Sequence, residues 1–504
     1  IYGDANNDII DAGAGDDIIY GHSVHNKNYT NNDTIDGGAG NNTLNYNSSA
    51  YAFVLDMTNL DGSGYATVDF SASLPTTHSQ NNTGNDHAFD DKIKDIQNIH
   101  GSRGGDTITG DASANIINGW WGHDTIYGGD ENDILYGGVH VDKLYGEAGD
   151  DYINLDQYSD TNTRVHSQSG EYAYGGDGND TIVSQGGSDY LYGEAGNDTF
   201  IVNYRPYELH GGDGRDVLTL GDTYLYLRGK DIQGLEELNI GSGSTYFNRD
   251  QFFNDNAFDK ITGDENSQLF IYGSNGVNDS FDLSVIDLSG FSGMFNFYAY
   301  SGTDTLKIGT NQDINMNEYY YNTFEEIEIG ANSNLNIEAY NDNGRTYLLD
   351  KDFSNVDESS NINVIGGAGN DTFRANYEAL LAGKLTIDGG VGSDMVDVRT
   401  ATTSSTLTFD EADMFSNIET LRLTNSNTRS NDIKIDAEAM KEWISSDSLI
   451  LDLYNDAQES KITVSNAKEI SGFNDSGVDF TGFDRGQTYD ITLDDNSVFQ
   501  MQVV

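Results

Sequence analysis

The chain has 504 residues, and its 25 Lys and Arg against 83 Asp and Glu give a formal net charge of −58. This acidity excludes the basic surface that a nucleic-acid binder needs and would repel an anionic membrane, so cations are the expected partners. Cysteine is absent, which excludes disulfides and thiolate metal sites, and no apolar run is long enough for a transmembrane helix.

The first segment, residues 1–45, is built from a nine-residue unit of the form Gly-Gly-x-Gly-x-Asp-x-apolar-x. Its sixth position is acidic at Asp8, Asp17 and Asp33, while the unit from Gly37 to Asn45 carries Asn42 there. Because the chain starts inside a unit, we expect it to be part of a longer protein.

Residues 46–100 break this register. Pro75 and the polar run from Ser79 to Asp86 predict an insertion that loops out from the side of the repeats. The apolar stretch Phe53-Val54-Leu55 still indicates a strand within it.

The main repeat block covers residues 101–219, with a polar loop predicted at 155–174. The register is unbroken from Gly101 to Asn154. The sixth positions of the whole block are Asp106, Asn115, Asp124, Asp133, Asp142, Asp151, Asp180, Asp189, Asp198 and Asp216.

The unit itself predicts the fold. Glycine permits the tight turn, and the x-apolar-x segment makes a very short strand with one inward side chain. Such a strand is stable only when units stack, pair their backbones and share a thin core. We therefore expect an all-β fold, an elongated parallel β-roll or β-solenoid.

The turns also predict a metal. They bring backbone carbonyls together beside a carboxylate, and an all-oxygen shell of this kind suits Ca²⁺ better than Mg²⁺. The alternative is that each Asp only caps turn amides without an ion. Copies in tandem and in phase favour metal binding.

These units resemble the hemolysin-type, or RTX, nonapeptide repeat, in which two units form one coil and ions lie between stacked turns. The resemblance implies an extracellular protein with several Ca²⁺ ions and turn carbonyls of residues such as Gly128, Asp130, Gly175 and Asp177 as assisting ligands. Asn42 and Asn115 depart from the pattern, so weaker or empty sites are expected there. The side-chain ligands implied are Asp8, Asp17, Asp33, Asp106, Asp124, Asp133, Asp142, Asp151, Asp180, Asp189, Asp198, Asp216, Asp371 and Asp394.

From residue 220 to 398 the nonapeptide is degenerate, with isolated units at Asp371 and Asp394 and weaker echoes at Asp279 and Asp304, which we leave out of the predicted ligands. A second pattern recurs with the alternation of a half-buried strand. Its copies are Gly234 to Ile240, Phe324 to Ile329 and Phe415 to Leu423.

This second pattern predicts a solenoid that continues with an aliphatic core in place of ions. Mixed with RTX units, it resembles surface-layer proteins that some Gram-negative bacteria export by type I secretion.

Residues 399–504 read as a β-rich C-terminal region. One helix is predicted from Asp436 to Ile444, with Asp436 as its cap. The end, Tyr489 to Val504, is acidic and then apolar. It resembles the uncleaved signal of type I secretion substrates, and a final β-hairpin would have the same pattern.

No catalytic motif is present: His-Glu-x-x-His is absent, and the string Gly21 to His25 lacks the last glycine of a nucleophile elbow. We therefore predict no enzyme, although an extended sheet could hold a polysaccharide for modification. The favoured hypothesis is a calcium-dependent surface-layer protein of a bacterial cell surface. The alternative is the C-terminal RTX region of a secreted adhesin or toxin.

The expected partner is a second copy of the chain, through lateral self-assembly. Cell-surface polysaccharide is a further candidate, because aromatic clusters can form sugar platforms or subunit contacts. These clusters are Tyr224-Leu225-Tyr226, Phe252-Phe253 and Tyr319-Tyr320-Tyr321, and their alternative role is to cover a thin core.

Overall fold

The computed structural model divides into two compact units, Ile1–Ser267 and Gln268–Val504. No helix among the described residues is long and apolar enough to cross a membrane. The residues that the structure describes are 1–3, 7–21, 32–70, 90–156, 170–221, 224–256, 258–301, 303–318, 324, 326–329, 333–339, 346–349, 361–366, 370–377, 380, 383, 385–400, 406–411, 413–425, 432–444, 448–453, 461–471, 479–481, 483–495 and 497–504.

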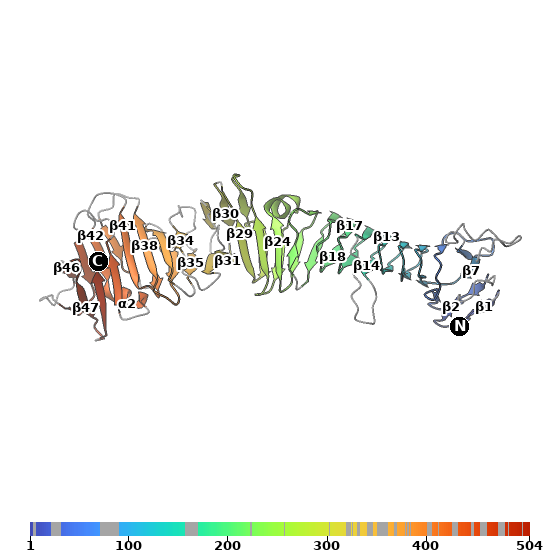
Figure 1. Ribbon diagram of the computed structural model, residues 1–504, viewed down its shortest axis with the longest axis horizontal. Coiled ribbons are helices and arrows are strands. Elements are labelled where there is room, and N and C mark those ends of the chain that lie inside the picture. The colour runs from blue at the N-terminus through green and yellow to red at the C-terminus, as the bar shows by residue number, and fades with distance from the viewer. Residues whose placement is uncertain are drawn as a thin grey trace. The chain divides into compact units, whose positions relative to one another are not determined.

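In the first unit, two sheets of short strands face each other across a thin core, as the coils around β13 to β18 show (Figure 1). The first sheet has the order β1 (Ile9–Asp11), β3 (Thr34–Asp36), β7 (Asp90–Lys94), β6 (Ala66–Asp69), β5 (Val54–Asp56), β9 (Thr107–Thr109), β11 (Thr125–Asp130), β13 (Lys143–Ala148), β15 (Tyr172–Asp177), β17 (Tyr190–Ala195), β19 (Glu208–Asp213) and β22 (Asp231–Gln233).

Within this unit the second sheet has the order β2 (Ile18–Tyr20), β4 (Thr43–Asn45), β8 (Asn98–His100), β10 (Ile116–Asn118), β12 (Ile134–Gly138), β14 (Tyr152–Asp156), β16 (Thr181–Ser184), β18 (Thr199–Val202), β20 (Val217–Leu220), β23 (Glu237–Ile240) and β25 (Lys260–Gly263). Parallel pairing places Ile126 beside Ile108 and Leu144, 18 residues apart along the chain. Two nonapeptides therefore make one coil, which confirms the predicted parallel β-roll.

The eighth position of each unit faces inward, as the repeat predicts. Ile108, Ile117, Ile126, Leu135 and Leu144 are fully buried, while their neighbours along each strand lie at the surface or in the turns. In these strands a single apolar residue thus builds the core.

The region predicted as an insertion, 46–100, contributes two kinds of strand. β7 and β8 pair in parallel with β3 and β4, so residues from Asp90 onward form a regular coil. In the first sheet β6 lies between β5 and β7 and pairs antiparallel with both strands. The predicted looping segment around Pro75 and Ser79 to Asp86 lies outside the described residues. The insertion is therefore narrower than its predicted bounds.

The loop predicted at 155–174 is narrower as well. β14 extends to Asp156, and β15 begins at Tyr172 in register with β13. The backbone thus continues the stack immediately on both sides of this interruption.

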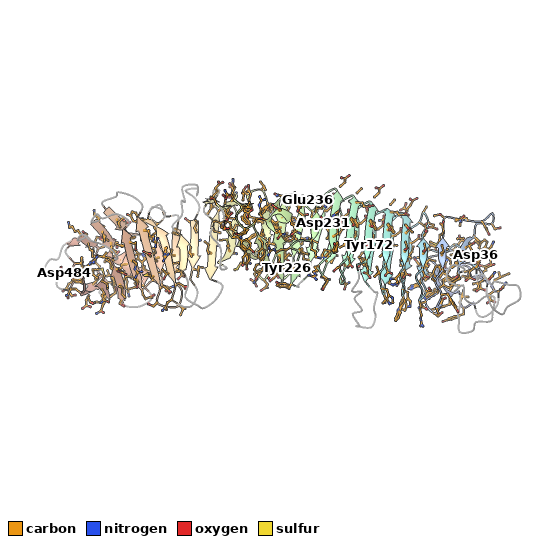
Figure 2. All side chains as sticks on the ribbon, turned by 45° about the horizontal axis from the view of Figure 1, so that its top comes forward. Asp36, Tyr172, Tyr226, Asp231, Glu236 and Asp484 are labelled. Carbon is orange, nitrogen blue, oxygen red and sulfur yellow. The ribbon has the colours of Figure 1, made fainter. Side chains whose placement is uncertain are left out.

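The outer face of the first sheet carries rows of tyrosine, because the residues on each side of an inward position point outward. Tyr127, Tyr145, Tyr174 and Tyr192 stack with centroid separations of 4.7, 4.7 and 4.9 Å. A second row includes Tyr172, labelled in Figure 2, which stacks on Tyr190 at 4.5 Å.

Towards the end of the first unit, β21 (Leu225–Tyr226) pairs in parallel with β24 (Ser244–Asn248), and a short π-helix follows at Gln251–Asp255. Buried amides hold this part together. The side-chain nitrogen of Gln251 donates to the Leu227 carbonyl at 3.0 Å, and that of Asn256 donates to the Ile232 carbonyl at 3.1 Å.

The second unit has longer parallel strands. One sheet contains β26 (Gln268–Tyr272), β29 (Met294–Tyr298), β31 (Asp313–Glu318), β33 (Asn334–Ala339), β35 (Asn361–Ile365), β37 (Leu385–Asp388) and β40 (Phe415–Ser416), and a small sheet contains β27 (Ser280–Asp282), β30 (Thr305–Ile308) and β32 (Glu326–Ile329). β28 spans Asp287–Phe291.

Two further sheets complete this unit. They contain β34 (Thr346–Leu349), β36 (Thr372–Asn376), β38 (Met395–Thr400), β41 (Thr420–Asn425), β43 (Ser448–Asp452), β48 (Val498–Val503), β47 (Thr488–Thr492) and β45 (Glu469–Ile470), then β39 (Thr406–Phe409), β42 (Asp432–Asp436), β44 (Lys461–Ser465) and β46 (Asp479–Thr481). Antiparallel pairing appears only among the last strands, within the described residues.

The core of the second unit is more aromatic than predicted. Phe281, Phe295, Phe297, Phe324 and Phe373 are all fully buried, in addition to the aliphatic side chains that were expected to form this core. Rings fill the wider coils that the longer strands enclose.

Local predictions in the second unit are confirmed. The helix α2 covers Ala437–Trp443, and the Asp436 side chain accepts hydrogen bonds from the N–H groups of Glu438 and Ala439. The final strands β47 and β48 form a β-hairpin.

Candidate metal centres

The sixth-position aspartates form rows along the turns of the roll, one residue per coil. Along most of each row, the aspartate accepts a hydrogen bond from the backbone N–H of the equivalent residue in the preceding coil. The Asp124 N–H donates to Asp142 Oδ1 at 2.8 Å, and the Asp133 N–H donates to Asp151 Oδ1 at 2.7 Å. The backbone N–H thereby fixes the position of Oδ1 in these carboxylates and leaves Oδ2 for other partners.

Two rows exist because each coil has two turns. The row that leads into the first sheet contains Asp8, Asp33, Asp91, Asp106, Asp124, Asp142, Glu171 and Asp189, and the row that leads into the second contains Asp17, Asn42, Gln97, Asn115, Asp133, Asp151, Asp180, Asp198, Asp216 and Glu236. The loop after Asp156 does not interrupt the second row: the Asp151 N–H reaches Asp180 Oδ1, 29 residues further on, at 2.8 Å. In the first row, Phe53 of the insertion donates to Asp106 Oδ1 in place of a row residue.

The second carboxylate oxygen of many of these aspartates is buried and has no hydrogen-bond partner. A buried polar atom in this state costs free energy unless something compensates it. These oxygens are Oδ2 of Asp17, Asp33, Asp124, Asp133, Asp142, Asp151, Asp180, Asp198, Asp216 and Asp394.

A glycine five residues earlier leaves space in front of this oxygen. A Cβ at Gly137 would lie 2.8 Å from Asp142 Oδ2 and 2.9 Å from the carbonyl oxygen of Leu155 in the next coil. The space that glycine leaves open is thus lined by a carboxylate and a backbone carbonyl. The same pair of groups lies beside Gly119, Gly128, Gly146, Gly175, Gly193 and Gly211.

Burial raises the pKa of these carboxyls above the ordinary value. The pKa is raised to about 9 in Asp124, about 8 in Asp142 and about 7 in Asp133 and Asp180. In Asp124 the neighbouring charges of Asp142 and Asp106 raise it further. A bound cation would favour the ionised form and offset the burial.

These observations fit Ca²⁺. Oxygen-only donors of mixed carboxylate and carbonyl type, converging from two successive coils, match the flexible shell that this ion takes. The row residues with a free Oδ2 would hold the ion, together with the glycine-turn carbonyls. The ion would supply the charge that lets successive carboxylates stack.

The predicted carbonyl ligands have different surroundings. The Gly175 carbonyl lies in the space beside Asp151 Oδ2, whereas the Gly128 carbonyl lies beside the amide of Asn115. The Asp177 carbonyl already accepts a hydrogen bond from the Gly149 N–H at 2.8 Å. Asp130 is exposed at the end of β11.

Two predicted ligands have protein partners on both carboxylate oxygens. Asp106 Oδ2 accepts from the Ser102 N–H at 2.6 Å, and its Oδ1 accepts from the Phe53 N–H at 2.9 Å. Asp189 Oδ2 accepts from the Ser184 hydroxyl at 2.7 Å, and Glu171 donates to its Oδ1. In these two turns a serine thus donates a hydrogen bond to Oδ2, the carboxylate oxygen that has no partner in the other turns.

Asp8 is the first residue of its row. It is partly exposed, and its N–H donates to Asp33 Oδ1. In the second unit, Asp371 donates its N–H to Asp394 Oδ1 at 2.7 Å. The weaker echoes behave in the same way, since the Asp279 N–H donates to Asp304 Oδ1 at 2.8 Å.

The asparagine turns are closed by their own amides. The Asn115 side-chain nitrogen donates to the Gln97 carbonyl at 3.0 Å, and its oxygen accepts from the Asp111 N–H at 2.9 Å. Asn42 donates to the Asp95 carbonyl at 3.0 Å. In these turns an N–H donor meets the carbonyls that would otherwise face a cation, consistent with the expected weaker or empty sites.

Five row residues were not predicted from the sequence: Asp91, Gln97, Glu171, Glu236 and Glu419. Asp91 lies next to the insertion, where the nine-residue spacing is lost. Gln97 and Glu171 keep that spacing, 18 residues before Asn115 and Asp189, but they are not aspartates. Glu236 and Glu419 belong to the second pattern, and each follows the last aspartate of a row. Glu236 and Glu419 share one sequence signal: each follows an apolar residue and stands two residues before the inward residue of a strand.

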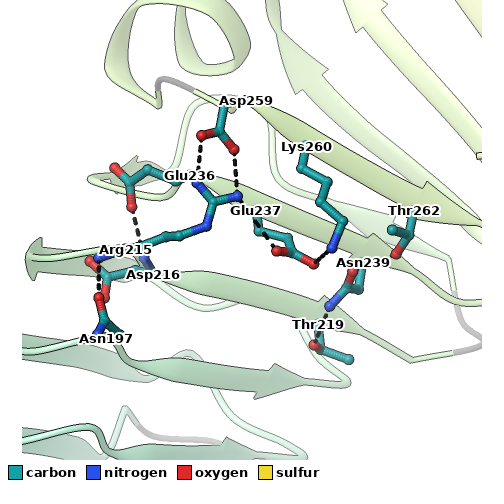
Figure 3. Close-up of polar contacts among 10 residues, drawn as sticks. All are labelled: Asn197, Arg215, Asp216, Thr219, Glu236, Glu237, Asn239, Asp259, Lys260 and Thr262. Carbon is teal, nitrogen blue, oxygen red and sulfur yellow. Dashed lines mark hydrogen bonds and ion pairs between the residues drawn. The ribbon is translucent and has the colours of Figure 1, made fainter. Parts of the chain in front are cut away.

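At the end of the row in the first unit, basic side chains pair with carboxylates that lie outside the row (Figure 3). The Asp216 N–H donates to Glu236 Oε2 at 2.7 Å. The Arg215 guanidinium forms a bidentate ion pair with Asp259, and Lys260 Nζ lies 2.7 Å from Glu237 Oε1. The buried Oδ2 of Asp216 keeps no hydrogen-bond partner beside these ion pairs.

The other sequence features give mixed outcomes. Phe252 is buried, and Tyr224 and Tyr226 are exposed, so the predicted aromatic clusters differ from one another in role. Tyr319-Tyr320-Tyr321 and residues 22–25 of the hydrolase-like string lie outside the described residues.

The fold and these turns define a calcium-binding parallel β-roll. The family model for the RTX calcium-binding nonapeptide repeat (4 copies) matches residues 1–26, 30–48, 96–126, 121–153, 169–201 and 363–376. The chain is therefore an RTX-type protein, and its many repeats bind several Ca²⁺ ions. No curated protein matches the chain.

Proposed function

We propose that the chain is a calcium-dependent structural protein of a bacterial cell surface, which self-assembles into a surface layer. The observation that carries this proposal is the unbroken row of buried carboxylates from Asp133 to Asp216. A stack with so much buried negative charge is stable only with a cation, so its folded form belongs where calcium is abundant.

Calcium also explains export in this proposal. In a cytosol with little free calcium, the carboxylates repel one another and the chain stays unfolded, as passage through a type I secretion channel needs. Outside the cell, millimolar calcium drives folding. The acidic and then apolar residues of the β47–β48 hairpin are the candidate secretion signal.

Lateral contact between copies is supported by the outer face of the first sheet. Its two rows of partly exposed, stacked tyrosines give a regular aromatic surface along successive coils. Aromatic side chains are favoured in protein interfaces because they bury a large area at small entropic cost. Calcium lowers the repulsion between chains whose formal net charge is −58.

Electron microscopy of the purified chain in millimolar calcium tests the proposal. Two-dimensional ordered arrays that dissolve on addition of a chelator are expected. Monomers that remain dispersed and bind cells through a receptor or polysaccharide would contradict it and favour the adhesin region instead.

A further inference from the structure

Four polar side chains meet on the outer face of the first sheet, on the last two strands of that sheet. Glu208 and His210 are two residues apart on β19, so both point outward. Parallel pairing places Asp231 of β22 beside Glu208, and Gln233 beside His210. The backbone hydrogen bonds of the sheet therefore hold these side chains in a fixed square; Figure 2 labels Asp231.

The distances within this group are longer than those of hydrogen bonds. His210 Nε2 lies 3.4 Å from Glu208 Oε1 and 3.5 Å from Asp231 Oδ1. Hydrogen bonds from nitrogen to oxygen span roughly 2.7–3.2 Å, so neither carboxylate makes one to this nitrogen. With metal–ligand bonds of about 2.0–2.1 Å, the ligands at the corners of a tetrahedron are roughly 3.3 Å apart.

We propose that Glu208, His210 and Asp231 bind one divalent transition-metal ion of the Zn²⁺ class. The three ligand atoms lie within 4.8 Å of one another, and one neutral imidazole with two carboxylates is a donor set that suits zinc. Calcium prefers six to eight oxygen donors, so the imidazole distinguishes this site from those in the turns.

Gln233 completes the group. Its side-chain nitrogen lies 2.9 Å from His210 Nε2 and 3.1 Å from Asp231 Oδ1. A half-turn of the amide brings its oxygen to the same place, where it would act as a fourth donor. Tyr192 packs edge-on against the His210 ring, with centroids 5.4 Å apart, and limits the movement of the imidazole.

The ligands of this site project from the outer face of the sheet and are not the carboxylates and carbonyls of the calcium turns, although His210 directly precedes Gly211. The test therefore uses the full chain, folded in saturating calcium. Zn²⁺ is titrated by calorimetry, and Co²⁺ is used as a visible probe of tetrahedral coordination. Two variants remove ligands, His210→Ala and Asp231→Asn, and His123→Ala serves as a matched control.

His123 is a suitable control because it is also exposed on the roll but accepts the Val141 N–H at its Nδ1, 3.2 Å away. The wild type and His123→Ala are expected to bind one Zn²⁺ equivalent that both ligand variants lose, with unchanged circular dichroism. The Co²⁺ absorption is expected to disappear in the ligand variants. Equal Zn²⁺ uptake by His210→Ala and wild type, or no uptake by the wild type, would overturn the proposal.

Discussion

The backbone N–H of Asp216 donates to Glu236 Oε2 at 2.7 Å, and the Asp394 N–H donates to Glu419 Oε2 at the same distance. In both units a glutamate thus ends a row of aspartates. The longer side chain reaches the last N–H from a coil that has no nonapeptide turn of its own. The second sequence pattern, which contains both glutamates, therefore marks the place where calcium turns stop.

Replacing Glu236 by Ala should destabilise the last calcium coil. The Asp216 N–H loses its acceptor in a buried position, which costs about 1–3 kcal/mol. Thermal unfolding in saturating calcium measures this as a lower melting temperature. Glu236→Gln, which keeps an acceptor oxygen, should stay close to the wild type, and equal melting of the Ala and Gln variants would argue against the capping role.

Replacing Asn115 by Asp should create a calcium site. The amide nitrogen that donates to the Gln97 carbonyl is exchanged for an oxygen, and the turn then offers a carboxylate beside the Gly128 carbonyl. Native mass spectrometry is expected to show one additional Ca²⁺ per chain. The reverse exchange, Asp133→Asn, should remove one ion, and unchanged counts in both variants would refute the assignment.

A methyl group at Gly137 should block a single turn. The new Cβ would come within 2.8 Å of Asp142 Oδ2 and 2.9 Å of the Leu155 carbonyl oxygen, where the ion is expected. Gly137→Ala should therefore bind fewer ions and fold at higher calcium concentration. Gly62→Ala is the control, because no atom lies within 4 Å of a Cβ there. An identical calcium midpoint for the two variants would contradict this prediction.

The calcium-free chain should be stabilised by acid. Folding raises the pKa to about 9 in Asp124 and about 8 in Asp142, whereas an unfolded Asp has a pKa of about 3.9. Such groups contribute their full stability below the unfolded pKa and lose it as pH rises through the folded pKa. With a chelator present, β structure should thus be greater at pH 4.5 than at pH 8. In calcium the trend should reverse, because binding requires ionised carboxylates.

Much of the fold follows from the sequence, because each nonapeptide fixes a turn, a three-residue strand and one inward residue. The regular spacing from Asp106 to Asp151 predicts the positions of the turns without information on distant contacts. The same spacing predicts the burial of Ile108 to Ile153. Asp91 could not be found in this way, because its row neighbour Asp33 is 58 residues away, across the insertion. Glu171 keeps the regular spacing, 18 residues before Asp189, and was missed because a glutamate replaces the aspartate of the repeat. For Asp91, position in the stack and not spacing along the chain decides its place in the row.

The same limit applies to the chemistry of individual turns. The sequence places Asp106 and Asp189 in the same class as Asp133, yet Ser102 and Ser184 occupy their carboxylate oxygens. Conversely, Asp279 and Asp304 look irregular in sequence but make the row hydrogen bond. Which oxygen remains free depends on side chains that only the folded turn brings together.

The central claim is that cations compensate the buried carboxylate rows and so control folding. Circular dichroism at pH 7.5 during a calcium titration tests it most directly, on the wild type and on a variant with Asp133→Asn and Asp151→Asn. The chain without calcium should lack cooperative β structure and gain it in the millimolar range, with a higher midpoint for the variant. A chelated chain that is already β-rich and melts cooperatively would contradict the account.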